Sequence, residues 1–209
     1  MLVRDRMSRM PITTNPSATI PDALQVMRGS KVRQLPVVTE KGDLVGIVAL
    51  DDLLRVSPSP ATSLSVWELD YLLEKITVEK VMTREVITVT EDTAVEEAGR
   101  IMADNRVSGL PVLRDGELVG IITESHLFNI LLELFGAREP GIRVTAKVHR
   151  EKGTLANISS AISELGAQFV AFGIAADSET VTFKVQDVER DVLLKTLEPL
   201  VASIEDVRE

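Results

Sequence analysis

The stretch LPVVTEKGDLVGIVALDDL, residues 35–53, occurs a second time as LPVLRDGELVGIITESHL, residues 110–127. Each copy places two apolar runs on either side of a short link that carries Gly42 or Gly116. Two apolar runs joined in this way are typical of a β-hairpin. The chain is therefore predicted to contain the same hairpin twice.

The similarity between the copies extends over most of the first 127 residues. Alignment pairs residues 3–39 with 78–114 and residues 41–53 with 115–127, and 17 of the 50 pairs are identical. A repeat of this length indicates duplicated units that pack on each other, although two copies are fewer than a solenoid needs. The methionines that recur in register are predicted core residues: Met7, Met27, Met82 and Met102.

Each copy is predicted to have the element order β-α-β-β-α. A short extended piece comes first, at 12–14 and 86–89, and the apolar spacing that follows favours an amphipathic helix. In the second copy, residues 93–96 (TAVE) have the pattern of a capping box, which predicts that this helix begins there. The last helix of each unit is expected to begin near Leu50 or Glu124.

The pattern changes after Phe135. A segment with Pro140 is predicted to be a hinge, and the apolar periodicity beyond it predicts the order β-α-β-β-α-β, the ferredoxin-like arrangement. The expected fold class is α+β. The expected boundaries are 1–57 for the first unit, 58–77 for a linker with a helix, 78–136 for the second unit, 137–141 for the hinge and 142–209 for the third domain.

Composition and charge exclude several kinds of function. The 209 residues include no cysteine, which excludes disulfides, a cysteine nucleophile and thiolate metal sites and fits the cytoplasm. The net charge of −9 argues against a nucleic-acid surface. The apolar stretch 127–135 is too short to span a bilayer. No nucleophile-elbow, zincin or P-loop pattern occurs, so no catalytic or metal-ligating residue and no prosthetic group is predicted.

Residues 3–54 and 78–132 resemble two CBS domains, which pair into a Bateman module. The Leu-Pro-Val strand, the glycine strand and the helix behind them carry this resemblance. Residues 142–209 resemble an ACT domain, and the order of the three domains is similar to that of bacterial AcuB-type acetoin-utilisation proteins. The resemblance implies a non-catalytic, allosteric regulator that forms a homodimer and has a partner enzyme in acetoin or acetate metabolism.

CBS domains of this kind bind adenosine-containing ligands between the paired units, through the pattern Gly-x-x-Thr/Ser-x-x-Asp. The hydroxyl and the helix start meet phosphate, and the aspartate holds the ribose hydroxyls. Here the pattern is divided: the first copy has Asp52 but Ala49, and the second has Thr123 but His126. The resemblance implies one asymmetric cleft for AMP, ADP, ATP, NAD or S-adenosylmethionine, with Asp52 as ribose ligand. Two empty clefts in an interaction protein are the other hypothesis.

The resemblance adds further residues to the predicted site. Arg33 matches a phosphate-binding arginine of related modules, and Lys31 and Arg106 occupy equivalent places that could add positive charge. The expected adenine pocket consists of three equivalent pairs: Ile12 and Ile87, Thr13 and Thr88, and Val37 and Val112. These residues also have structural explanations, because acids and hydroxyls cap helices and loop charges are often solvated.

In the third domain, Gly153, Thr154 and Leu155 align with the loop where ACT domains bind amino acids. The acidic residue common before the glycine is missing, and residues 150–152 (REK) stand there instead. Two hypotheses follow for this domain: an amino-acid sensor, or a domain that only dimerises.

Overall fold

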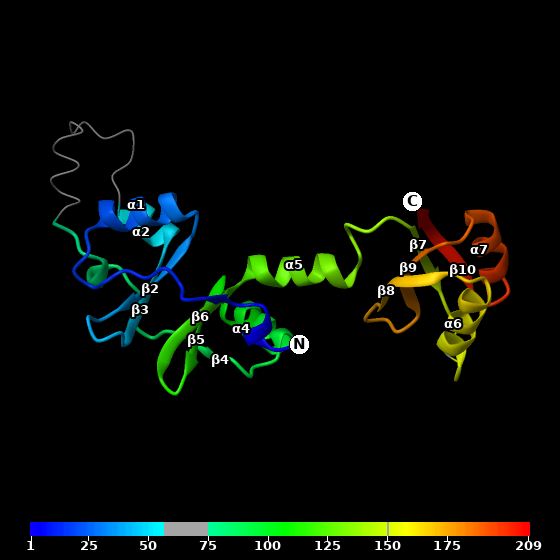
Figure 1. Ribbon diagram of the computed structural model, residues 1–209, viewed down its shortest axis with the longest axis horizontal. Coiled ribbons are helices and arrows are strands. Elements are labelled where there is room, and N and C mark those ends of the chain that lie inside the picture. Colours follow the sequence, from blue (N-terminus) through cyan, green and yellow to red (C-terminus); the bar gives the residue numbers. More distant parts are fainter. Residues whose placement is uncertain (57–74, 150) are drawn as a thin grey trace. The chain divides into compact units, whose positions relative to one another are not determined.

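The computed structural model describes residues 1–56, 75–149 and 151–209 (Figure 1). The chain forms two compact units, Met1–Leu127 and Phe128–Glu209. The boundary between them falls inside helix α5, Glu124–Leu134. Most of the predicted linker helix at 58–77 lies outside the described residues.

Both copies of the repeat lie in the first unit, and the predicted order β-α-β-β-α is found in the second copy. In the first copy, the extended piece expected at 12–14 is only a single bridge, in which Thr14 pairs with Val37. The first copy consists of α1 (Ile20–Ser30), β2 (Gln34–Val38), β3 (Leu44–Ala49) and α2 (Leu50–Val56). The second consists of β4 (Val89–Thr90), α4 (Val95–Asn105), β5 (Gly109–Arg114), β6 (Glu117–Thr123) and α5. The short elements in front of them are η1 (Val3–Asp5), β1 (Ser8–Arg9) and η2 (Val78–Lys80). Strands β2 and β3 pair with each other, and the second copy contributes to a sheet in the order β1-β6-β5-β4.

The helices after the first extended pieces begin differently in the two copies. Thr19 caps α1, because its hydroxyl accepts the backbone N–H of Asp22 at 3.3 Å. The capping box predicted at 93–96 is wrong. Helix α4 has Ala94 as its N-cap, and the Thr93 hydroxyl instead accepts the N–H of Thr90 at 3.1 Å. Thr93 lies one residue before the N-cap, and its hydroxyl closes the turn that precedes the helix.

The segments that precede the two copies are exchanged between them. Strand β1 pairs antiparallel with β6, and Val3 is fully buried in the hydrophobic cluster of the second copy. In return, Val78 and Met82 are buried in the cluster of the first copy. Equivalent backbone bonds hold both segments: the N–H of Val3 donates to Thr93 at 2.9 Å, and that of Val78 to Ala18 at 2.9 Å. Each copy therefore completes the core of the other.

The repeated strand glycines make room for this exchange. A Cβ atom on Gly46 would lie 2.5 Å from the Met82 sulfur and 3.1 Å from the backbone oxygen of Thr83. A Cβ atom on Gly120 would overlap the sulfur of Met7 in the same way. In each copy, the glycine of the hairpin thus leaves the space into which the methionine of the exchanged segment packs. Of the four methionines predicted for the core, Met27, Met82 and Met102 are buried, and Met7 is partly buried against the cluster of the second copy.

The second unit has the predicted order β-α-β-β-α-β. Its elements are β7 (Ile142–Lys147), α6 (Thr154–Glu164), β8 (Gln168–Ile174), β9 (Thr180–Gln186), α7 (Arg190–Leu197) and β10 (Ser203–Arg208). All neighbouring strands are antiparallel, in the order β10-β7-β9-β8. Both helices pack on one face around Phe183, which is buried with Ile158 and Leu193. This is the split β-α-β topology of the ferredoxin-like arrangement.

The segment predicted as a hinge is fastened to this sheet. The Lys184 ammonium donates to the carbonyl oxygen of Gly136 at 3.1 Å, and the Gln186 amide donates to that of Pro140 at 2.7 Å. A Cβ atom on Gly173 would lie 3.0 Å from the Phe135 ring, so the end of α5 also packs on β8.

Candidate functional site

The start of α2 gathers the polar groups predicted for the first copy. The N–H of Leu50 donates to the carbonyl oxygen of Arg33 at 2.9 Å, which places Arg33 beside the first turn of the helix. The half-buried Asp52 reaches back, and its Oδ2 accepts the N–H of Ala49 at 3.0 Å. This is one half of a capping box. Because a carboxylate has about four acceptor positions, Asp52 can cap the helix and still accept ligand hydroxyls.

His126 caps α5 in the same manner. Its Nδ1 lies 3.0 Å from the backbone nitrogen and 2.9 Å from the hydroxyl of Thr123. A backbone N–H can only donate, so Nδ1 is the unprotonated nitrogen and Nε2 carries the hydrogen. Nε2 lies 3.2 Å from the hydroxyl of Ser8, in the exchanged strand β1. The two copies therefore keep the same cap with different chemistry, a carboxylate in one and a neutral imidazole in the other.

The histidine makes this cap sensitive to pH. Burial lowers the pKa of His126, because the folded protein disfavours the charged imidazolium. The unfolded chain therefore binds a proton more readily, with a pKa of about 6.5, and the stability that the neutral cap contributes is complete above that pH. Lowering the pH from about 7.5 to 5.5 is expected to reduce the free energy of unfolding, as measured by urea denaturation.

Replacement of the histidine by the acid of the first copy provides the matched comparison. His126→Asp retains an acceptor for the Thr123 N–H but stays ionised over this pH range. In this variant, most of the decrease in the free energy of unfolding at low pH should disappear, whereas His149→Asn should show the same decrease as the unmodified protein. An unchanged pH dependence in His126→Asp would contradict the assignment of the cap.

A contact between the two copies brings their helix starts together. Gln34 lies opposite Ala49 in the first hairpin, and Gly109 lies opposite Thr123 in the second. The Gln34 amide donates to the hydroxyl of Ser108 at 2.6 Å, and a Cβ atom on Gly109 would overlap the amide oxygen. That oxygen is buried without a hydrogen-bond partner among the described residues. Gln34 was not among the residues predicted from the sequence. The available signal was that the equivalent position of the second copy, 109, is a glycine.

The remaining predicted cations have a structural role. Lys31 and Arg106 end α1 and α4 in the left-handed conformation, with φ of 56° and 55°. Their N–H groups donate to carbonyl oxygens of the preceding turn, and both side chains are exposed. Their equivalence therefore reflects helix termination, and the structure brings neither ammonium nor guanidinium into an ion pair among the described residues.

The three pairs of residues predicted for the adenine pocket differ in their exposure. Ile12 and Ile87 are exposed, at 41% and 36%. Thr13 and Thr88 are half-buried. The side chains of Val37 and Val112 are fully buried in the two hydrophobic clusters, so only their main chain can face a ligand.

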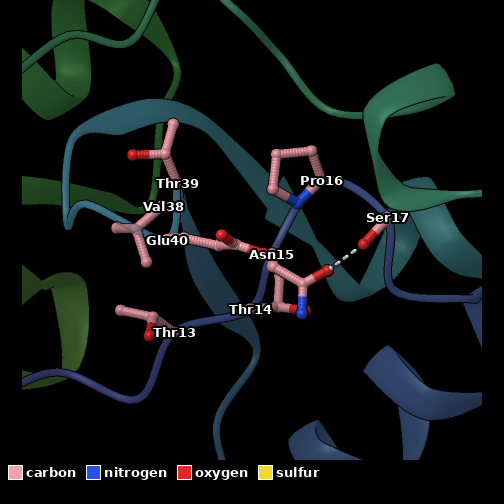
Figure 2. A pocket seen from close by; sticks show the side chains of 8 residues that line it. All are labelled: Thr13, Thr14, Asn15, Pro16, Ser17, Val38, Thr39 and Glu40. Atoms are coloured by element: carbon pink, nitrogen blue, oxygen red, sulfur yellow. Dashed lines mark hydrogen bonds between the residues drawn. The ribbon is translucent and has the colours of Figure 1, made fainter.

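A pocket of about 580 Å³ lies in the first copy, at the end of β2 away from Asp52 (Figure 2). Backbone bonds between Thr14 and β2 hold one wall: Thr14 donates to Pro36 at 3.0 Å and accepts from Val38 at 2.9 Å. The lining residues are Thr13, Thr14, Asn15, Pro16, Ser17, Val38, Thr39 and Glu40. Only Thr13 was predicted from the sequence, although NPS at 15–17 is a turn signal.

The predicted effector loop of the second unit is bonded to itself. Gly153 precedes α6 with φ of 92°, and the Thr154 hydroxyl donates to the carbonyl oxygens of His149 and Glu151, both at 3.1 Å. Leu155 is exposed, and residue 150 lies outside the described part of the chain.

No three side chains of His, Asp or Glu within 1–56, 75–149 and 151–209 are grouped closely enough to hold a metal ion. In the same ranges, no helix combines the length and the apolar character required to cross a bilayer.

Comparison with known proteins agrees with the duplicated architecture. The crystal structure of the CBS domain pair of protein MJ0100, in complex with 5′-methylthioadenosine and S-adenosyl-L-methionine, is 31% identical with a TM-score of 0.53. It covers 66% of this chain and 98% of that chain. The crystal structure of CBSX2 in complex with AMP is also 31% identical, with a TM-score of 0.52, covering 63% of this chain and 96% of that chain.

A third structure is a putative acetoin utilization protein (AcuB) from Vibrio cholerae, 31% identical with a TM-score of 0.53, covering 67% of this chain and 98% of that chain. L-aspartate semialdehyde sulfurtransferase of Methanocaldococcus jannaschii is 32% identical over 139 residues, which is 66% of this chain but only 24% of that enzyme. The family model described as CBS domain matches residues 3–59 and 78–133, together more than half of the chain. The chain therefore belongs to the CBS domain family, as a tandem pair.

Proposed function

We propose that this protein is a non-catalytic regulator that binds an adenosine-containing ligand at the helix starts of its paired CBS domains. Asp52 holds the ribose hydroxyls, and Arg33 and the start of α2 face phosphate. Thr123 and His126 contribute the neighbouring helix start from the second copy. The observation that supports this most is the contact between Gln34 and Ser108, which joins strands that end at both helix starts.

Two further findings support the proposal. The similar CBS pairs of MJ0100 and CBSX2 have been solved with 5′-methylthioadenosine, S-adenosyl-L-methionine or AMP bound. Within this chain, Ile12 and Ile87 leave apolar side chains exposed at equivalent positions, where an adenine ring could cover them. The ligand would shift the packing between the copies only if its affinity differs between two arrangements of them.

Thermal unfolding against a panel of AMP, ADP, ATP, NAD and S-adenosylmethionine tests the proposal. A ligand at ~100 times its dissociation constant adds about 2.7 kcal/mol to the free energy of unfolding. We expect Asp52→Ala to weaken binding about 10- to 100-fold, because it removes charge-assisted hydrogen bonds to the ribose. The ligand-induced change in melting temperature should therefore nearly disappear.

Asp51→Ala is the matched control, since it removes the same charge from the neighbouring exposed position of the same helix turn. It should leave the ligand-induced change intact. Because Asp52→Ala also removes a cap, its melting temperature without ligand should fall as well, and the comparison uses only the change that the ligand produces. Equal responses of the two variants, or no response of the unmodified protein to any ligand, would overturn the proposal.

A second candidate role is homodimerisation through the second unit. Strand β8 is an edge of its sheet and contains no charged residue. Its apolar side chains are exposed: Phe169 (37%), Phe172 (41%) and Ile174 (53%). The opposite edge strand, β10, carries Glu205, Asp206 and Arg208, charges that discourage strand pairing. The unprotected β8 edge favours antiparallel pairing with β8 of a second copy, a self-complementary contact.

We further propose that residues 142–209 are an ACT-like domain and that 1–57 and 78–136 are the two CBS domains. Regulation of a partner enzyme in acetoin or acetate metabolism is proposed from the similarity to the putative AcuB protein. Amino acids added to the unfolding panel test the effector loop at Gly153, Thr154 and Leu155. A response to an amino acid alone would make the second unit the sensor.

A further inference from the structure

The surface beside the end of β2 and the equivalent surface beside the end of β5 carry different side chains. Parallel pairing establishes the equivalence, because Thr14 lies opposite Val37 in the first copy as Val89 lies opposite Val112 in the second. The chain beyond these pairs forms a short wall beside the end of β2 or β5.

In the second copy, an arginine fills this place. Arg114, at the end of β5, forms an ion pair with Glu91, and its Nη2 lies 2.8 Å from the Glu91 Oε1. The Glu91 side chain is 13% exposed, whereas the Arg114 side chain is 60% exposed, so the ion pair lies at the surface with the carboxylate on its inner side. The fold at this position is thus able to hold a guanidinium group against the wall after β4.

In the first copy, both partners of that ion pair are replaced. Pro16 stands in the position of Glu91, and Thr39 in that of Arg114. The Thr39 hydroxyl is used within its own hairpin, where it accepts the N–H of Lys41 at 3.3 Å and that of Asp43 at 3.2 Å. The short side chain leaves the pocket of about 580 Å³ (Figure 2), a volume in the range of ligand sites.

The walls of this pocket provide acceptors for a cation. Glu40 lines it and has no counterpart in the second copy, so its carboxylate is an addition of the first. Asn15, Thr13 and Thr14 contribute oxygen atoms, and no lysine, arginine or histidine is among the lining residues. Within the described residues, no cation forms an ion pair with Glu40. The net charge of −9 also attracts cations to the protein.

We propose that this pocket binds a guanidinium group, with the Glu40 carboxylate as its counter-charge, in the place that Arg114 fills in the second copy. The planar group donates several hydrogen bonds and suits a carboxylate flanked by amide and hydroxyl oxygens. The pocket shares Thr13 with the predicted adenine pocket but lies away from Asp52, which is at the other end of the hairpin, where Gln34 faces Ala49. The inference does not depend on adenosine binding.

Titration of the full-length protein with L-arginine, followed by amide NMR shifts, tests the proposal. We expect saturable shifts confined to the amides of residues 13–15, 17 and 38–40, and none with L-citrulline, which has nearly the same shape without the charge. N-acetyl-arginine amide distinguishes the two sources of the group. Equal binding of the blocked compound indicates an arginine side chain of a protein, whereas binding of free L-arginine alone indicates the amino acid.

Two variants and a control complete the test. Glu40→Gln should weaken L-arginine binding about tenfold, because it removes the counter-charge. Combining Pro16→Glu with Thr39→Arg rebuilds the ion pair of the second copy and should abolish binding by filling the pocket. Glu117→Gln, in the second hairpin, should bind as the unmodified protein does. Absence of saturable shifts, equal binding of L-citrulline, or unchanged affinity in Glu40→Gln would overturn the proposal.

Discussion

The Gly46→Ala variant is expected to be less stable than the unmodified protein by about 1–3 kcal/mol, the usual cost of an extra methyl group in a packed core. The added Cβ atom would lie 2.5 Å from the sulfur and 2.9 Å from the Cγ atom of Met82, and 3.1 Å from the main chain of Thr83. The side chain could yield, but the main chain is held by two bonds of 2.9 Å between Ile47 and Thr83. Urea denaturation measures this loss, because the midpoint and the slope of the transition together give the free energy of unfolding.

Gly29→Ala is the matched control. Nothing lies within 4 Å of a Cβ atom built on Gly29, which sits inside helix α1. Alanine there should leave stability unchanged or raise it by up to ~1 kcal/mol. If the contact with the exchanged segment is the cause, combining Gly46→Ala with Met82→Ala should cost less than the two separate losses added together. Full additivity, or an undisturbed Gly46→Ala variant, would contradict this explanation of the repeated glycine.

The Phe172→Lys variant is expected to convert a homodimer into a monomer. Phe172, on the edge strand β8, lies opposite Phe183 of β9, and the two rings stack with centroids 6.2 Å apart. A lysine there would place a positive charge at the centre of a symmetric strand pair, next to the same charge from the second copy. Light scattering coupled to gel filtration should show the mass falling by half.

Val192→Lys tests whether any charge on an exposed apolar position has this effect. Val192 is 46% exposed on helix α7 of the same unit and does not belong to the β8 edge. This variant should remain a dimer. A dimer that survives Phe172→Lys would place the interface elsewhere, and a monomeric unmodified protein would remove the proposed role of β8.

The sequence alone determined the elements of this protein because periodicity and duplication are local signals. Apolar alternation on either side of Gly42 and Gly116 identified both hairpins, and helical spacing identified α1 and α4. Similar patterns gave the order of the second unit. The divided pattern of Asp52 and Thr123 was visible as well, since it depends only on comparing one copy with the other.

Only the tertiary structure decided which copy each flanking segment completes. Val3 and Val78 are identical and begin equivalent segments, so no local pattern distinguishes packing on the same copy from packing on the other. It also decided how His126 replaces an acid, because the role depends on the distance from Nδ1 to the Thr123 nitrogen. Contacts between residues far apart in the chain are set by packing and hydrogen-bond geometry, and a repeat in the sequence leaves those choices open.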